Sequence, residues 1–120
     1  MRHQLGWEAW ERYVNSVLRL DSTIASGSQA HDPGDGVDRR HHSVTDYALM
    51  ADAKYTEQKS FSVSAKLMGQ YVRRAAEMGK RFVLPVRLVD SVTKEVHDYI
   101  VVPLQDYTAL LEAYRETEGE

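Results

Sequence analysis

The chain has 120 residues, which is enough for one domain with a buried core and too few for a second independent domain. Hydrophobic residues make up 42% of the sequence and charged residues 28%, a composition typical of folded rather than disordered proteins. There are no cysteines, so disulfides, thiolate metal sites and a cysteine nucleophile are excluded, and a metal would be held by oxygen or imidazole. We therefore expect residues 1–120 to form a single domain.

The formal net charge of −3 argues against a bulk electrostatic DNA binder. Residues 31–87 nevertheless hold ten Lys or Arg against seven Asp or Glu, whereas the two flanks hold five against eleven. This locally basic middle suits contact with phosphate, and scattered solubility charge is the alternative explanation. Because the apolar runs are too short to span a membrane and the first residues form no signal peptide, we expect a cytoplasmic protein without membrane contact.

The first predicted element is an amphipathic helix from Leu5 to about Asp21. Aromatic and aliphatic residues recur at steps of three and four along it, which predicts one inward-facing stripe. The stripe consists of Trp7, Trp10, Tyr13, Val14, Val17, Leu18 and Leu20. The next segment, Ser26 to Gly36, is rich in glycine, proline, aspartate and serine, and therefore predicts a long loop of the kind that is often functional.

A strand is predicted from Val44 to Tyr55, because this segment is apolar and alternates with polar residues at its end. A second helix follows, capped by Ser62 or Ser64 and ending at Gly79. Its predicted buried stripe consists of Leu67, Met68, Tyr71, Val72, Ala75 and Met78.

Two further strands are predicted, Arg81–Val89 and Tyr99–Leu104, with a turn between them that allows a hairpin. Pro85 indicates that the first of the two lies at a sheet edge or contains a bulge. A last helix begins at Gln105 or Asp106 and includes Leu110, Leu111 and Tyr114. The expected fold class is α/β, with a central mixed sheet flanked by helices in the order α-β-β-β-α-β-β-α.

The segment Asp52-Ala53-Lys54 carries the residue types of a hydrolytic metal site at the end of a buried strand. Alternation along the strand places Asp52 and Lys54 on one face. Carboxylates from neighbouring strands can hold a hard cation such as Mg²⁺ beside a scissile phosphate. A lysine two residues further on can orient the attacking water or balance charge in the transition state.

The chain resembles the PD-(D/E)xK nucleases, and among them the small Holliday-junction resolvases of archaea and phages. The likeness extends to about Leu88 and matches the order of elements in that family, which has a restriction-endonuclease-like core. The segments that carry it are Gly6–Val14, Ala25–Ser28, Pro33–Asp38, Tyr47–Thr56 and the helix containing Gln70.

The resemblance implies roles for individual residues. Asp52 takes the place of the second acidic ligand, and Lys54 that of the motif lysine. The first aspartate is Asp38, which gives the more usual separation from Asp52, or Asp35, which follows Pro-Gly as in phage relatives. The residues after Asp38 are more polar than the strand expected there.

The N-terminal helix supplies a further glutamate in this family, and Glu11 or Glu8 takes that place here, unless both are simply solvated helix acids. Basic and polar residues that would contact DNA, or that are ordinary surface charge, are Arg39, Arg40, Lys59, Lys66, Arg73, Arg74 and Gln70.

The resemblance implies an endodeoxyribonuclease that depends on Mg²⁺ or Mn²⁺ and cuts branched DNA such as four-way junctions, acting as a homodimer. No phosphate-binding loop with a following Lys-Ser/Thr is present, so no nucleotide cofactor is expected. Two alternatives stay open: a DNA- or protein-binding module that retains the fold without activity, and an endonuclease acting on linear duplex DNA.

Overall fold

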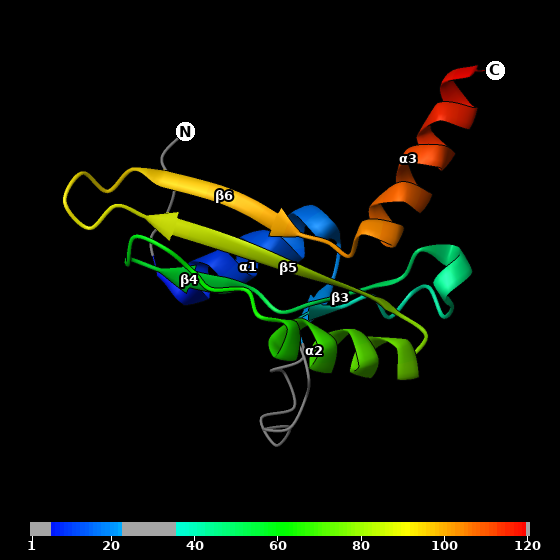
Figure 1. Cartoon of the computed structure of the whole chain (residues 1–120), viewed down its shortest axis with the longest axis horizontal. Coiled ribbons are helices and arrows are strands. Elements are labelled where there is room, and N and C mark those ends of the chain that lie inside the picture. Colours follow the sequence, from blue (N-terminus) through cyan, green and yellow to red (C-terminus); the bar gives the residue numbers. More distant parts are fainter. Residues whose placement is uncertain (1–5, 23–35, 120) are drawn as a thin grey trace.

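A computed structural model describes residues 6–22 and 36–119. Figure 1 shows a sheet with α1 and α2 packed against it and α3 leading away from it. The elements in chain order are α1 (Trp7–Leu18), β1 (Asp21–Ser22), β2 (Gly36–Val37), η2 (Val44–Asp46), β3 (Leu49–Ala51), β4 (Lys54–Thr56), α2 (Ala65–Glu77), β5 (Arg81–Val89), β6 (Val96–Val101) and α3 (Leu104–Gly119). The predicted α/β class with a mixed sheet is confirmed. No helix in the described part of the chain is both long and apolar enough to cross a membrane.

The sheet is built around β5. Both β3 and β4 run parallel to it with the same offset of 32 residues, since Leu49 pairs with Arg81 and Lys54 with Val86. They therefore follow one another along one edge of β5, and the antiparallel strand β6 occupies the other edge. Beyond β3 the sheet continues with β2, which is antiparallel to β3, and then with β1, which is antiparallel to β2. The predicted hairpin of the last two strands is confirmed.

Pro85 explains why β3 and β4 are separate strands. In the parallel ladder, the N–H of Asp52 donates to the carbonyl of Val83 (N···O 3.3 Å), and the residue two positions further along β5 would donate back to the carbonyl of Asp52. That residue is Pro85, which has no N–H. The ladder is therefore interrupted at Asp52. Pro85 does not lie in an edge strand, because β5 has neighbours on both sides. It does not lie in a bulge either, because the pairing with β6 continues in unbroken register from Leu84 through Pro85 to Val86.

Apolar cores lie on both faces of the sheet. The core under α1 consists of Trp10, Val14, Leu20, Ala51, Ala53 and Val83. The core under α2 consists of Val37, Met50, Ala75, Phe82, Leu84 and Val86. Since successive strand residues face opposite sides, Asp52 and Lys54 lie on the α2 face, as the sequence predicted for a shared face.

The buried stripe of α1 is narrower than its sequence indicated. Trp10 and Val14 are buried, whereas Trp7, Tyr13 and Val17 are between 43% and 55% exposed. The reason is that α1 meets the sheet chiefly along the short strand β4. On α2, Ser64 is the cap, since its Oγ accepts a hydrogen bond from the N–H of Leu67 (3.0 Å).

The predicted strand from Val44 begins later, because its first residues form the 3-10 turn η2. The turn ends at Tyr47, which has a positive φ of 58° that is incompatible with a strand. The predicted strand Tyr99–Leu104 is shifted in the opposite direction, since β6 is Val96–Val101 and Leu104 already belongs to α3.

The first turn of α3 is fastened to the body of the protein. Arg81 forms an ion pair with Asp106 (Nη1···Oδ1 2.7 Å), and its guanidinium lies 4.6 Å from the ring centre of Tyr47. The hydroxyl of Tyr47 donates to the carbonyl of Asp106 (2.6 Å). Burial, and then the charge of Asp106, raises the pKa of Tyr47, while Arg81 opposes this. The rest of α3 stands away from the sheet.

Candidate functional site

Asp52 and Lys54 form an ion pair at the interruption between β3 and β4. The ammonium of Lys54 lies 2.8 Å from Oδ2 of Asp52. Asp52 is only 6% exposed. Its Oδ2 has no hydrogen-bond partner among the described residues, so the contact with the Lys54 ammonium is an ion pair that lacks the geometry of a hydrogen bond. Burying a carboxylate oxygen without a hydrogen-bond donor is costly. A bound water or ion can satisfy such an acceptor.

A second carboxylate, that of Glu11 on α1, lies within electrostatic reach of this ion pair. Its pKa is raised, first by burial and then by the negative charges of Asp52 and Glu8, while Lys54 lowers it in part. Glu11 is partly buried and Glu8 is exposed. The structure thus brings Glu11 within electrostatic reach of both Asp52 and Lys54, and the repulsion between the two carboxylates favours a cation between or beside them.

These residues fit a hard divalent cation. Mg²⁺ and Mn²⁺ take carboxylate oxygens together with waters and substrate phosphates, and the buried Oδ2 of Asp52 lacks a hydrogen-bond donor among the described residues. Within residues 6–22 and 36–119, no three His, Asp or Glu side chains are grouped closely enough to hold a metal. The carboxylates of Asp52 and Glu11 would therefore need water, a phosphate or a further acidic side chain to complete the coordination.

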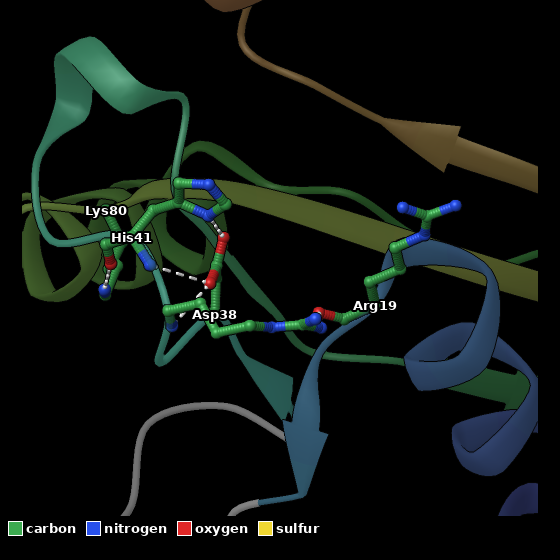
Figure 2. Close-up of polar contacts among 5 residues, drawn as sticks. Arg19, Asp38, His41 and Lys80 are labelled. Atoms are coloured by element: carbon green, nitrogen blue, oxygen red, sulfur yellow. Dashed lines mark hydrogen bonds and ion pairs between the residues drawn. The ribbon is translucent and has the colours of Figure 1, made fainter.

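Asp38 lies in a network of its own (Figure 2). Its Oδ1 accepts hydrogen bonds from the backbone N–H groups of Arg40 (2.9 Å) and His41 (3.1 Å), and its Oδ2 lies 2.8 Å from Nδ1 of the His41 ring. Burial raises the pKa of Asp38, but the hydrogen bonds from Arg40 and His41 outweigh it and the pKa is lowered. The side chain of Lys80 donates to the carbonyl of His41 and fixes the same turn.

The pairing register separates Asp38 from Asp52. The N–H of Asp38 donates to the carbonyl of Leu49 (2.8 Å), three residues before Asp52. Residues that lie opposite one another in a sheet share a face, and Leu49 packs against the core under α1. Asp38 thus belongs to the face opposite Asp52 and lies about 10 Å further along the strand. Asp35, the other candidate from the sequence, lies outside the described residues.

The predicted DNA-contacting residues are all exposed and fall into two groups. The turn after β2 carries Arg39 and Arg40, and Nη2 of Arg40 also donates to the carbonyl of Arg19 (3.1 Å). The segment before α2 and the helix itself carry Lys59, Lys66, Gln70, Arg73 and Arg74. Helix α2 itself lies close to the site, because the ammonium of Lys54 is 6.0 Å from the ring centre of Tyr71 on this helix.

Arg87 was not identified as important from the sequence. It lies on β5, is 1% exposed, and forms an ion pair with Asp98 of β6 (Nε···Oδ1 2.7 Å). The signal that could have found it is a single arginine within the otherwise apolar run Phe82–Val89, because a buried arginine requires a charged partner. The partner itself comes from the pairing of β5 with β6, in which Arg87 lies opposite Asp98.

No family model and no curated protein matches the chain. Among solved structures, the chain is similar to Hjc, a Holliday junction resolvase from the archaeal hyperthermophile Archaeoglobus fulgidus. The two share 20% sequence identity, with a TM-score of 0.50 over 79% of this chain and 73% of Hjc. At this identity the likeness shows the fold, which is the restriction-endonuclease-like core of Hjc.

Proposed function

We propose that the chain is a divalent-metal-dependent endonuclease that cuts branched DNA, such as four-way junctions, by hydrolysis of a phosphodiester bond. The observation that carries the proposal is the ion pair between the buried Asp52 and the partly exposed Lys54, which lies within electrostatic reach of Glu11 on a resolvase-like fold. Because a four-way junction needs two paired cuts and one chain supplies one site, the proposal includes a homodimer.

Asp52 and Glu11 would hold the Mg²⁺ or Mn²⁺ ion through their carboxylates. A bound divalent cation stabilises the charge that develops on the phosphate and lowers the pKa of a coordinated water. Lys54, now paired with Asp52 at 2.8 Å, would turn its ammonium toward the attacking water and the phosphate when the carboxylate is engaged. The exposed cations of α2 would bind the DNA backbone beside the site.

Asp35 is the better candidate for the first acidic ligand. Gly36, which follows it, pairs with Ala51, the residue before Asp52. Gly36 also passes close to α1, since any side chain at this position would collide with the side chain of Asn15. The backbone next to Asp35 is therefore held beside the backbone next to Asp52. This adjacency supports Asp35 over Asp38, whose carboxylate is engaged by Arg40 and His41.

We expect Asp35→Asn to abolish metal-dependent cleavage without lowering thermal stability, and Asp38→Asn to lower stability while cleavage is retained. The lowered pKa of Asp38 means that its carboxylate stabilises the fold above its ordinary pKa. This stabilisation disappears as the pH falls through the folded-state pKa. The Tm difference between wild type and Asp38→Asn should therefore be present at pH 7 and shrink in acid. Loss of cleavage in Asp38→Asn alone would restore Asp38 as the ligand.

The proposed activity is tested with the full chain on four substrates: a four-way junction, a three-way junction, linear duplex and single-stranded DNA. Each substrate is incubated with Mg²⁺, with Mn²⁺, with Ca²⁺ and with a chelator. We expect cleavage of the junctions with Mg²⁺ or Mn²⁺ and none with chelator.

Metal-dependent cleavage of linear duplex at the same rate as the junctions would replace branched DNA by ordinary duplex as the substrate. Binding of DNA without cleavage of any substrate would contradict the enzyme and favour a binding module that retains the fold. Cleavage that persists in chelator would contradict the metal requirement.

A further inference from the structure

Arg87 is a charged side chain with almost no access to water. Its side chain is 2% exposed, yet arginine keeps its charge at all ordinary pH values. The charge is met by Asp98 in a two-pronged contact, Nε to Oδ1 at 2.7 Å and Nη2 to Oδ2 at 2.8 Å. This pairing joins β5 to β6 and holds the guanidinium plane in one orientation.

The guanidinium also contacts two aromatic rings of α1. Its central carbon lies 4.5 Å from the ring centre of Trp10 and 5.5 Å from that of Tyr13. The two rings are stacked on one another, with centres 5.9 Å apart and planes 24° apart. One side chain of β5 thus connects the sheet with α1, through a contact that is both apolar and electrostatic.

The contact with Trp10 concerns the proposed metal site because Trp10 directly precedes Glu11. Glu11 lies within electrostatic reach of Asp52, whose like charge helps to raise the pKa of Glu11, so the position of α1 decides how close the two carboxylates lie. Among the described residues, none forms a hydrogen bond with the indole Nε1 of Trp10. Its position depends on packing against the α1 core and on Arg87.

We propose that Arg87, oriented by Asp98, is a positioning residue that fixes α1 on the sheet and thereby sets the separation of Glu11 from Asp52. The inference rests on the proposed function, since it assigns Arg87 a role in forming the metal site. It does not make Arg87 a ligand, because its side chain contacts α1 and β6.

The decisive variant is Arg87→Lys, which keeps the charge and loses the two-pronged contact and the flat stacking surface. Arg81→Lys is the matched control, because Arg81 also pairs with an aspartate and lies over an aromatic ring. Its partners are Asp106 of α3 and Tyr47, so it holds α3 and not α1. Backbone amide hydrogen exchange is measured for α1 and α2, and Mn²⁺ binding is measured calorimetrically, each with the full chain. The binding measurement is repeated with Glu11→Gln in both backgrounds.

We expect Arg87→Lys to speed exchange in α1 but not in α2, and to weaken Mn²⁺ binding about tenfold when Glu11 is present, a difference typical of disturbed ligand orientation. With Glu11→Gln in place, Arg87→Lys should weaken Mn²⁺ binding by less than about twofold, because sites that act through one another are not additive. Arg81→Lys should change neither α1 exchange nor Mn²⁺ binding. If Arg87→Lys fails to fold, Tyr13→Leu removes one stacking ring, keeps the ion pair and should shift both measurements in the same direction.

Unchanged α1 exchange in Arg87→Lys would overturn the inference. Equal weakening of Mn²⁺ binding with and without Glu11 would overturn it as well, since Arg87 would then act on general stability. If wild type binds no Mn²⁺, the proposed metal site fails, and the exchange data alone decide whether Arg87 holds α1.

Discussion

Replacing Asp52 by asparagine should reduce metal-dependent cleavage by about 10³-fold or more, which is the effect of removing a principal charge-stabilising group from a hydrolytic site. Asparagine has nearly the same shape as aspartate and suits a position that is 6% exposed. It removes the negative charge that pairs with Lys54 and that we propose to bind the cation. Single-turnover cleavage at saturating Mn²⁺ separates loss of chemistry from loss of metal binding.

The same substitution should leave the free energy of unfolding within about 1 kcal/mol of wild type or raise it. Asparagine relieves the repulsion between Asp52 and Glu11, and Lys54 is 34% exposed in its side chain and remains hydrated. Asp46→Asn is the matched control, because Asp46 is exposed on η2 and should change neither cleavage nor stability. Full cleavage by Asp52→Asn would contradict the site assignment, and a large loss of stability would make Asp52 a structural residue.

Removing Asp98 should destabilise the protein more than removing Arg87, although both changes break the same ion pair. Asp98→Ala leaves the guanidinium of Arg87 buried, charged and without its carboxylate, which costs about 3–5 kcal/mol. Arg87→Met leaves Asp98, whose side chain is 29% exposed and can be hydrated, so we expect a cost of about 2 kcal/mol. Urea unfolding followed by tryptophan fluorescence measures both values.

The double variant Arg87→Met/Asp98→Ala sharpens this prediction. Because it leaves no unpaired charge, it should be more stable than Asp98→Ala alone. His97→Ala serves as the control on β6, since the side chain of His97 is exposed and its ring pairs with the exposed Glu95. Equal costs for the two single changes would mean that water reaches Arg87 after all. Additive costs in the double variant would mean that the pair does not act as a unit.

Local sequence patterns predicted most of the fold. The second helix has its apolar stripe and its capping serine within one short segment, and the strand Arg81–Val89 is apolar apart from Arg81 and Arg87. Elements whose ends depend on distant residues were less predictable. The exposure of Trp7 was not predictable from α1 alone, because the helix has an uninterrupted amphipathic pattern. Trp7 is exposed because α1 covers so little of the sheet.

The geometry of the candidate site was predictable only for residues that are near one another in the sequence. Asp52 and Lys54 are two positions apart on one strand, so alternation alone places them together. The choice between Asp35 and Asp38 depends on the register of β2 against β3, because a shift of one residue changes the face on which a side chain lies. Similarly, Glu11 comes within electrostatic reach of Asp52 through the packing of α1, which no local pattern specifies.

The proline at position 85 offers a way to search genomes for relatives that overall similarity does not reveal. Its missing N–H interrupts the ladder at Asp52, thirty-three residues earlier in the chain. The two positions are therefore linked by strand pairing, although they are far apart in the sequence. A query that requires Asp-x-Lys, a helix, and then a proline in the middle of an apolar strand combines three weak signals into one selective pattern. Sequences collected in this way would supply the evolutionary record needed to separate inherited site residues from incidental surface charge.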